Sequence, residues 1–131
     1  MHLLPDGGAG LRIIDSDRVC DAIAALGDRR GVLDWARRYS SLADPTRLSL
    51  LLCVHRAGPI SVSDLAAAVG LSEATVSQSL RLLRGGGAVS AEREGRVVRY
   101  TLADQTLVPL LEAVNPDAEL HHSQGSAAGC G

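Results

Sequence analysis

Residues 61–84 most constrain how this chain can fold, because they have the pattern of two short helices joined by a tight turn. Ser61 followed by Asp64 resembles a capping box, with Asp in place of the usual Glu or Gln. Gly70 can adopt the positive φ that closes a helix, and Ser72 can cap the next one. The spacing therefore predicts one helix that ends near Gly70 and a second that begins just after Ser72.

The second of these helices has one apolar face and one polar face. Val76, Leu80 and Leu83 fall at helical spacing and are expected to point inward. The opposite face carries short hydrogen-bonding groups and two fixed positive charges, from Glu73, Ser77, Gln78, Arg81 and Arg84. Glutamine can pair with adenine, and arginine with guanine or phosphate, so this face suits the DNA major groove. An ordinary amphipathic helix with a solvated polar face is the alternative interpretation.

Three further helices are predicted before this pair. Asp15 or Ser16 can cap the first, which Gly27 ends, and the second covers about residues 30–42. The dipeptide at 44–45, Asp-Pro, is a strong start signal, because proline at the first helical position loses no hydrogen bond. The helix after it is apolar on most sides and is expected at the centre of the core.

Two strand-like runs follow the helical pair, joined by Glu94 and Gly95. They predict a tight β-hairpin with Arg93, Arg96 and Arg99 at its tip and flank. A plain solvated hairpin is the alternative, since arginine is common on surfaces. A basic hairpin directly after such a helix is, however, placed to contact the neighbouring backbone phosphates.

A last helix is expected to run to about Val114, and Pro109 constrains where it begins. If Asp104 were the cap, Pro109 would sit at the fifth helical position and remove a hydrogen bond. With Thr106 as the cap, Pro109 sits at the third position, where no partner is lost. We therefore prefer Thr106 as the cap.

Composition limits the classes of function. The net charge of −2 gives no global basic surface, but residues 72–100 carry five Arg against three Glu, so any nucleic-acid surface is local. Three widely spaced cysteines do not resemble a disulfide framework, and no apolar run reaches membrane-spanning length. We expect a cytoplasmic protein with one domain at 15–115, a flexible segment at 1–14 and a disordered His-containing tail at 116–131. No phosphate loop or nucleophile motif indicates an enzyme.

Three segments in combination carry a resemblance to a known family: LADPTRLSLLL, ISVSDLAAAVGLSEATVSQSLRLLR and EREGRVVRYTLAD. With them the sequence resembles the ArsR/SmtB family of winged-helix regulators that respond to metals. The resemblance covers about residues 42–111. It implies a mainly α winged helix-turn-helix fold with a small β-hairpin, in the order α-α-α-α-α-β-β-α. It further implies a homodimer, joined through its first and last helices, that binds an inverted repeat in a promoter.

The same resemblance places Thr75, Ser77 and Gln78 at the base-contacting positions, whereas Glu73 stands where relatives often carry Gln. Together with the arginines of the helix and hairpin, the candidate DNA-binding residues are Thr75, Ser77, Gln78, Arg81, Arg84, Arg93, Arg96 and Arg99.

The metal sites that the resemblance implies are degenerate in this sequence. Members that bind metals through thiolates resemble one another in the segment L-C-V-C-D-L. This chain has I-S-V-S-D-L there, with Ser61 and Ser63 in place of the two cysteines. Hydroxyls are poor ligands for ions that select thiolate, so a site of that type is not expected. Members that bind zinc, nickel or cobalt resemble one another in a second ligand pattern across the last helix. It consists of D-x-H and, ten residues further on, H-x-x-H or H-x-x-E. The corresponding residues here are Asp104, Thr106, Asp117 and Leu120, so two carboxylates are present, and both imidazoles and the fourth ligand are missing.

The tail offers another ligand set for a nickel, zinc or cobalt ion, because imidazole and carboxylate suit borderline ions. The candidate metal ligands are Asp104, Asp117, Glu119, His121 and His122. Weak, non-specific metal binding by a flexible His-His pair is the alternative. Two other modes of control stay open. One is a thiol-based redox or persulfide switch at Cys20 and Cys53, for which the alternative is that both are unreactive residues packed in the core. The other is regulation by a partner protein.

Overall fold

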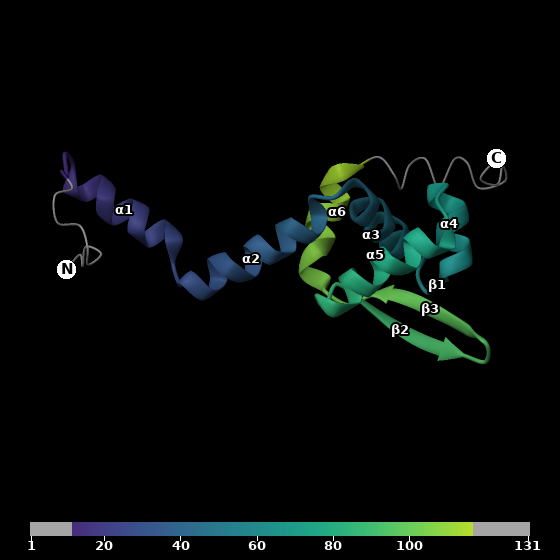
Figure 1. The fold of residues 1–131 in the computed structure, drawn as a ribbon. Coiled ribbons are helices and arrows are strands. Elements are labelled where there is room, and N and C mark those ends of the chain that lie inside the picture. Colours follow the sequence, from purple (N-terminus) through teal and green to yellow (C-terminus); the bar gives the residue numbers. More distant parts are fainter. Residues whose placement is uncertain (1–11, 117–131) are drawn as a thin grey trace. The chain divides into compact units, whose positions relative to one another are not determined.

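The computed structural model describes residues 12–116, in the order α-α-α-β-α-α-β-β-α with a short 3-10 turn before the last helix (Figure 1). The predicted order is confirmed, with one additional strand. The chain divides into two compact units, residues 1–37 and residues 38–131. The domain limits at 15–115 stay a prediction, and the predictions for residues 1–11 and 117–131 lie outside the described range. Within that range, none of the helices combines the length and the apolar character that a membrane span needs.

Local capping sets the limits of the first helix, α1 (Ser16–Leu26). The carboxylate of Asp15 accepts a hydrogen bond from the backbone N–H of Arg18 at 3.2 Å, and Gly27 follows with a φ of 55°. Both limits confirm the sequence prediction. Helix α2 (Arg29–Leu42) begins close to the expected position. Large apolar side chains of these two helices are exposed in the single chain: Leu26, Val32, Leu33, Trp35 and Tyr39.

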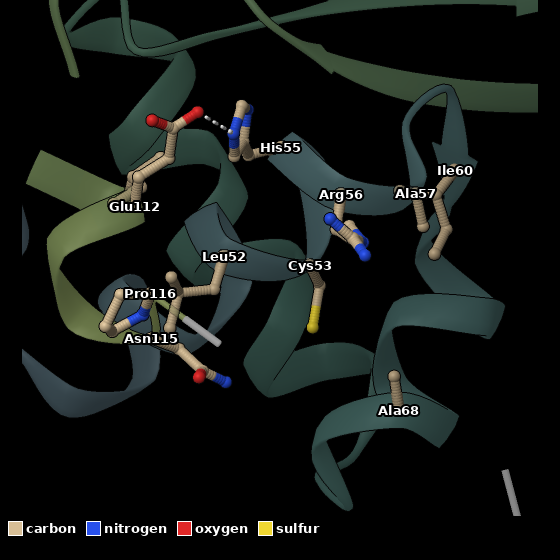
Figure 2. A pocket seen from close by; sticks show the side chains of 11 residues that line it. Leu52, Cys53, His55, Arg56, Ala57, Ile60, Ala68, Glu112, Asn115 and Pro116 are labelled. Atoms are coloured by element: carbon tan, nitrogen blue, oxygen red, sulfur yellow. Dashed lines mark ion pairs between the residues drawn. The ribbon is translucent and has the colours of Figure 1, made fainter. Parts of the chain in front are cut away.

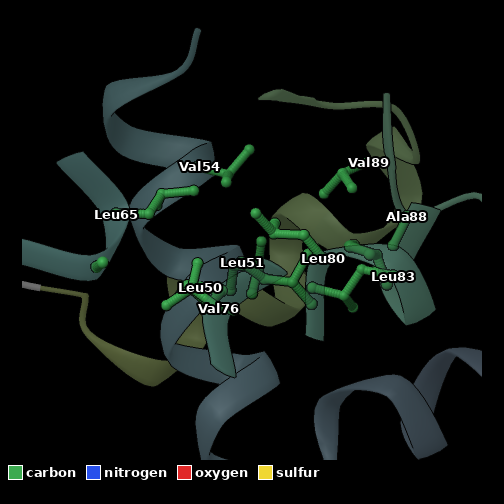
Figure 3. Close-up of a cluster of buried hydrophobic side chains, with 12 residues drawn as sticks. Leu50, Leu51, Val54, Leu65, Val76, Leu80, Leu83, Ala88 and Val89 are labelled. Atoms are coloured by element: carbon green, nitrogen blue, oxygen red, sulfur yellow. The ribbon is translucent and has the colours of Figure 1, made fainter. Parts of the chain in front are cut away.

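Helix α3 (Pro45–Ala57) supplies the centre of the core in the second unit. Asp44 caps it by accepting from the backbone N–H of Arg47 at 2.9 Å. The apolar side chains of α3 pack in a cluster to which α4, α5, α6 and the sheet also contribute side chains (Figure 3). The buried cluster is made of Leu50, Leu51, Val54, Leu65, Ala66, Val76, Leu80, Leu83, Ala88, Val89, Leu107 and Leu111. A core without aromatic rings is the expected result of this composition.

The helical pair forms as the sequence predicts. Ser61 accepts from the backbone N–H of Asp64 at the start of α4 (Val62–Val69), and Gly70 closes that helix with a φ of 72°. Ser72 then accepts from the backbone N–H of Thr75 and begins α5 (Glu73–Gly85). An L side chain at position 70 would be strained in this left-handed conformation, so glycine there makes the tight turn possible.

The hairpin consists of β2 (Val89–Glu94) and β3 (Val97–Leu102), and a third strand, β1 (Ile60–Ser61), completes the sheet. The order is β1-β3-β2, and all pairing is antiparallel. The turn was expected at Glu94-Gly95, but Glu94 pairs with Val97, so the two turn residues are Gly95 and Arg96. This shift moves Arg96 to the tip of the hairpin. The sequence pattern missed β1 because two residues are too short to show alternation.

The start of the last helix differs from the prediction. Thr106 is not its cap: Asp104 Oδ1 accepts from the backbone N–H of Thr106 at 3.1 Å and begins a 3-10 turn, Gln105–Leu107. Helix α6 (Val108–Val114) follows, with Pro109 in its first turn. The 3-10 turn lets Asp104 cap the chain while Pro109 still falls where a missing N–H costs no hydrogen bond.

Candidate nucleic-acid interface

The outer face of α5 presents the polar side chains that the sequence placed there. Val76, Leu80 and Leu83 are at most 1% exposed and hold the helix to the core. The predicted contact residues on the other side, Thr75, Gln78, Arg81 and Arg84, are exposed, and Ser77 is half-buried at the margin. The face therefore combines hydrogen-bonding groups and positive charge on a helix whose position is set by its buried side.

Two hydrogen bonds at the start of α5 orient Thr75. Its backbone N–H donates to Ser72 Oγ at 3.1 Å, and Ser72 Oγ donates in turn to Thr75 Oγ1 at 2.9 Å. The Thr75 hydroxyl thus accepts from within the protein and can direct its own proton outward. A donor held in this way suits a phosphate oxygen or a base acceptor near the N-terminal end of the helix.

Sequence reasoning missed Leu82, which is 60% exposed on the outer side of α5. Leucine at position 82 is out of phase with Val76, Leu80 and Leu83, and that phase difference was the signal that could have identified it. An exposed methyl-bearing side chain beside Gln78 is suited to contact the methyl group of thymine.

The wing carries its arginines in two different settings. Arg93 and Arg96 are exposed at the strand end and the tip. Arg99 lies in the central strand, with its Nε 3.7 Å from Glu94 Oε2, and that Nε is buried without a hydrogen-bond partner among the described residues. Arg99 is therefore partly engaged within the wing, whereas Arg93 and Arg96 extend from it. The side chain of Tyr100 packs against the core.

The described residues do not assemble a metal site of the expected kind. Arg38 Nε lies 3.1 Å from Asp104 Oδ2, while the backbone and hydroxyl of Thr106 both donate to Asp104 Oδ1. Partial burial raises the pKa of Asp104, but the hydrogen bonds from Thr106 and Arg38 outweigh it and lower the pKa below its ordinary value. The Asp104 carboxylate is therefore already paired with the guanidinium of Arg38. No group of three or more metal-ligating side chains occurs in residues 12–116.

The four other candidate ligands, Asp117, Glu119, His121 and His122, lie outside the described residues. The serines in the places of the family's cysteines have structural partners, because Ser61 caps α4 and Ser63 Oγ donates to Glu73 Oε1. A thiolate-type site is therefore replaced by hydrogen bonds that hold the helical pair.

A cavity of about 580 Å³ lies between α3, α4 and α6 (Figure 2). Its wall is mainly apolar and includes Leu52, Ile60 and the half-buried thiol of Cys53. His55 Nε2 and Glu112 Oε1 face one another 3.8 Å apart at its edge. The described residues give this cavity no set of ligands for a metal ion.

The two redox candidates have protonated, weakly nucleophilic thiols. Burial raises the pKa of Cys53, and burial followed by the charges of Asp17 and Asp21 raises the pKa of Cys20. The thiolate is the reactive form, so neither environment activates its cysteine. Cys20 belongs to the first unit and Cys53 to the second. A redox role for the pair stays a prediction.

Comparison with known proteins places this arrangement among DNA-binding proteins. A helix-turn-helix domain family matches residues 42–90. The chain is 39% identical to the HTH-type transcriptional regulator NmtR of Mycobacterium tuberculosis over 95 residues, which are 72% of this chain and 78% of that protein. It is 44% identical to a transcriptional repressor SmtB homolog of Synechocystis over 79 residues, 60% of this chain and 59% of the relative.

Among solved structures, the cadmium metal-sensor CmtR from Mycobacterium tuberculosis superposes with a TM-score of 0.53 at 44% identity. The match covers 61% of this chain and 82% of CmtR. The helical pair thus lies within a recognised helix-turn-helix domain, and the fold is shared with a transcriptional regulator.

Proposed function

Because this chain belongs to the ArsR/SmtB family of winged helix-turn-helix transcriptional regulators, we propose that it binds an inverted-repeat operator as a homodimer. In this proposal α5 enters the major groove of each half-site and the wing contacts the neighbouring phosphates. The observation that carries it is the exposed outer face of α5, where Gln78 and Arg81 stand opposite a fully buried apolar side.

The exposed apolar side chains support the homodimer. Leu26, Leu33 and Trp35 are exposed on α1 and α2, and Val114 is exposed at the end of α6. Burial of such side chains against a second copy would remove apolar surface from water, and a two-fold dimer buries the same side chains of both chains. Joining through the first and last helices leaves α5 of each chain to bind one half-site.

The function is tested by titrating labelled duplex DNA with the purified protein over a range of salt concentrations. If arginine–phosphate contacts supply most of the affinity, the logarithm of the binding constant falls linearly and steeply with the logarithm of the salt concentration. A module that binds only other proteins would show no such salt-dependent binding.

Replacing Arg96 by alanine is expected to weaken binding to all DNA sequences alike. A dimer would lose one phosphate contact per chain, so the salt slope would decrease by about 1.8. Arg96 is suited to this role because it is exposed at the tip of the wing and makes no base-reading pair in the proposal. Fluorescence anisotropy at several salt concentrations measures the slope.

The matched control is Arg18→Ala, which removes an equally charged side chain from α1, where Arg18 pairs with Asp15 at 3.0 Å. This variant should keep the wild-type slope. An unchanged slope for Arg96→Ala would remove the wing tip from the interface.

We further propose that a transition metal of the nickel, zinc or cobalt class modulates DNA affinity. The relative CmtR is a cadmium metal-sensor, which supports this proposal. In this chain the donors would be Asp117, Glu119, His121 and His122, because Asp104 is already bound by Arg38 and Thr106. Imidazole and carboxylate oxygen are suitable ligands for these ions.

Deleting residues 117–131 is expected to abolish any change of DNA affinity on adding metal, since the proposed donors are then absent. Calorimetry with nickel, zinc and cobalt, followed by DNA titration of each metal form, measures both effects. His55→Gln in the full chain is the control and should keep the response. If the truncated protein still responds, the metal site lies elsewhere; if the full chain never responds, control by a partner protein becomes the better proposal.

A further inference from the structure

A side-chain hydrogen bond joins the first turns of the two helices of the DNA-binding pair. Ser63 Oγ donates to Glu73 Oε1 at 2.6 Å. Ser63 is the second residue of α4 and Glu73 is the first residue of α5, and both are exposed. The bond crosses the turn and holds the Glu73 carboxylate at the N-terminal end of α5, which a free glutamate side chain would not do.

The N-terminal end of a recognition helix is the part that meets base edges. A carboxylate there can only accept hydrogen bonds, and Ser63 occupies one of its two oxygens. In the major groove, guanine turns two acceptors toward the protein, thymine an acceptor and a methyl group, and adenine an acceptor beside its amino donor. Cytosine turns only its N4 amino group, so it is the base that an oriented carboxylate fits best.

We propose that Glu73 selects cytosine at one position of each half-site, and that Ser63 is the positioning residue that orients the carboxylate. The inference rests on the proposed insertion of α5 into the major groove. Glu73 reads the base through Oε2, while Oε1 stays bound to Ser63. The pair therefore sets a base preference that Gln78 does not set.

The hydrogen bond could instead serve only to tie α4 to α5. The two roles differ in what they change. A structural tie affects the melting temperature and affinity for all sequences, whereas a positioning role affects the preference at one base position. The test therefore reads the base preference and the melting temperature of the same variants.

The experiment selects bound sequences from a random duplex pool with the full chain and counts each base at each half-site position. For the wild type, cytosine should be preferred about tenfold at one position. Glu73→Gln should move that preference to adenine, which a glutamine amide matches, and leave the other positions unchanged. Ser63→Ala should reduce the cytosine preference to about threefold or less, and Ser63→Thr, which restores a hydroxyl, should recover it.

Ser49→Ala is the matched control, because the hydroxyl of Ser49 donates to the Pro45 carbonyl oxygen within α3. It should leave every base preference unchanged. If Glu73→Gln changes no position while Gln78→Ala does, the role of Glu73 is overturned and the proposed function stands. A Ser63→Ala variant with a lower melting temperature and full cytosine preference would show a structural tie only. If the wild type enriches no sequence, both proposals fail.

Discussion

Replacing Gln78 by alanine is expected to remove about 1–3 kcal/mol of base discrimination per half-site, and so at least about tenfold of operator affinity, while binding to unrelated DNA stays the same. Gln78 is exposed on the outer face of α5, between the buried Val76 and Leu80. Its amide offers a donor and an acceptor together, which match N6 and N7 of adenine. The measurement is a parallel titration of an operator duplex and a scrambled duplex.

The matched control is Gln105→Ala. Gln105 is also exposed, but it lies in the 3-10 turn and its Nε2 donates to the Leu102 carbonyl oxygen at 3.2 Å. Its replacement should change neither titration. Equal losses of Gln78→Ala on the operator and on scrambled DNA would contradict a base contact and indicate that the substitution acts on the fold or on phosphate binding.

Replacing Leu80 by alanine is expected to lower the free energy of unfolding by about 2–5 kcal/mol, because it leaves a cavity in a closely packed core. Leu80 is 0% exposed and belongs to the cluster that joins α5 to α3 (Figure 3). Small domains have only about 5–15 kcal/mol of stability in total, so a large part would be lost. Urea unfolding followed by far-UV circular dichroism measures the change, at one fixed protein concentration because a dimer's stability depends on it.

Leu82→Ala provides the comparison on the same helix, two residues along. Leu82 is 60% exposed, and surface substitutions of this kind usually change stability by less than about 0.5 kcal/mol. The variant should unfold like the wild type and show any effect only in DNA binding. If the two substitutions destabilised the protein equally, the assignment of inner and outer faces of α5 would be wrong.

Four of the helix starts could be predicted from the sequence because a cap acts within three residues. Asp15, Asp44, Ser61 and Ser72 each accept a hydrogen bond from the backbone N–H three positions on. The last three were identified from their residue type and the apolar spacing that follows, and Asp15 was one of two candidates beside Ser16. The buried face of α5 was predictable for a similar reason. Its phase follows from helical geometry alone, and the phase also determines which side chains are left outside.

Contacts between distant residues could not be predicted in this way. Arg38 and Asp104 are 66 positions apart, so the family resemblance made Asp104 a candidate metal ligand and gave no sign of the arginine beside it. The same limit applies to Ser63 and Glu73, whose bond depends on the angle of the turn between two helices. The residue type indicates which kinds of ligand a side chain can bind, whereas the fold determines which partner lies within bonding distance of it.

Leu82 and the wing illustrate the limits at the interface itself. An exposed leucine has no polar chemistry to mark it, and only its position out of phase with the core distinguishes it. In the wing, the sequence pattern predicted the same role for Arg93, Arg96 and Arg99. The pairing register instead places Arg99 beside Glu94 and leaves Arg96 at the tip. Which of these side chains contacts DNA stays a prediction until the variants are measured.

The central claim is that two copies of α5 are held at a fixed separation that matches DNA. Its most direct test is the affinity of the full chain for inverted repeats in which the distance between half-site centres is varied base pair by base pair. A sharp maximum is predicted near one DNA turn, at about 10–10.5 base pairs, with two chains bound per duplex. Affinity that does not depend on the spacing, or a single chain bound to one half-site at full strength, would contradict it.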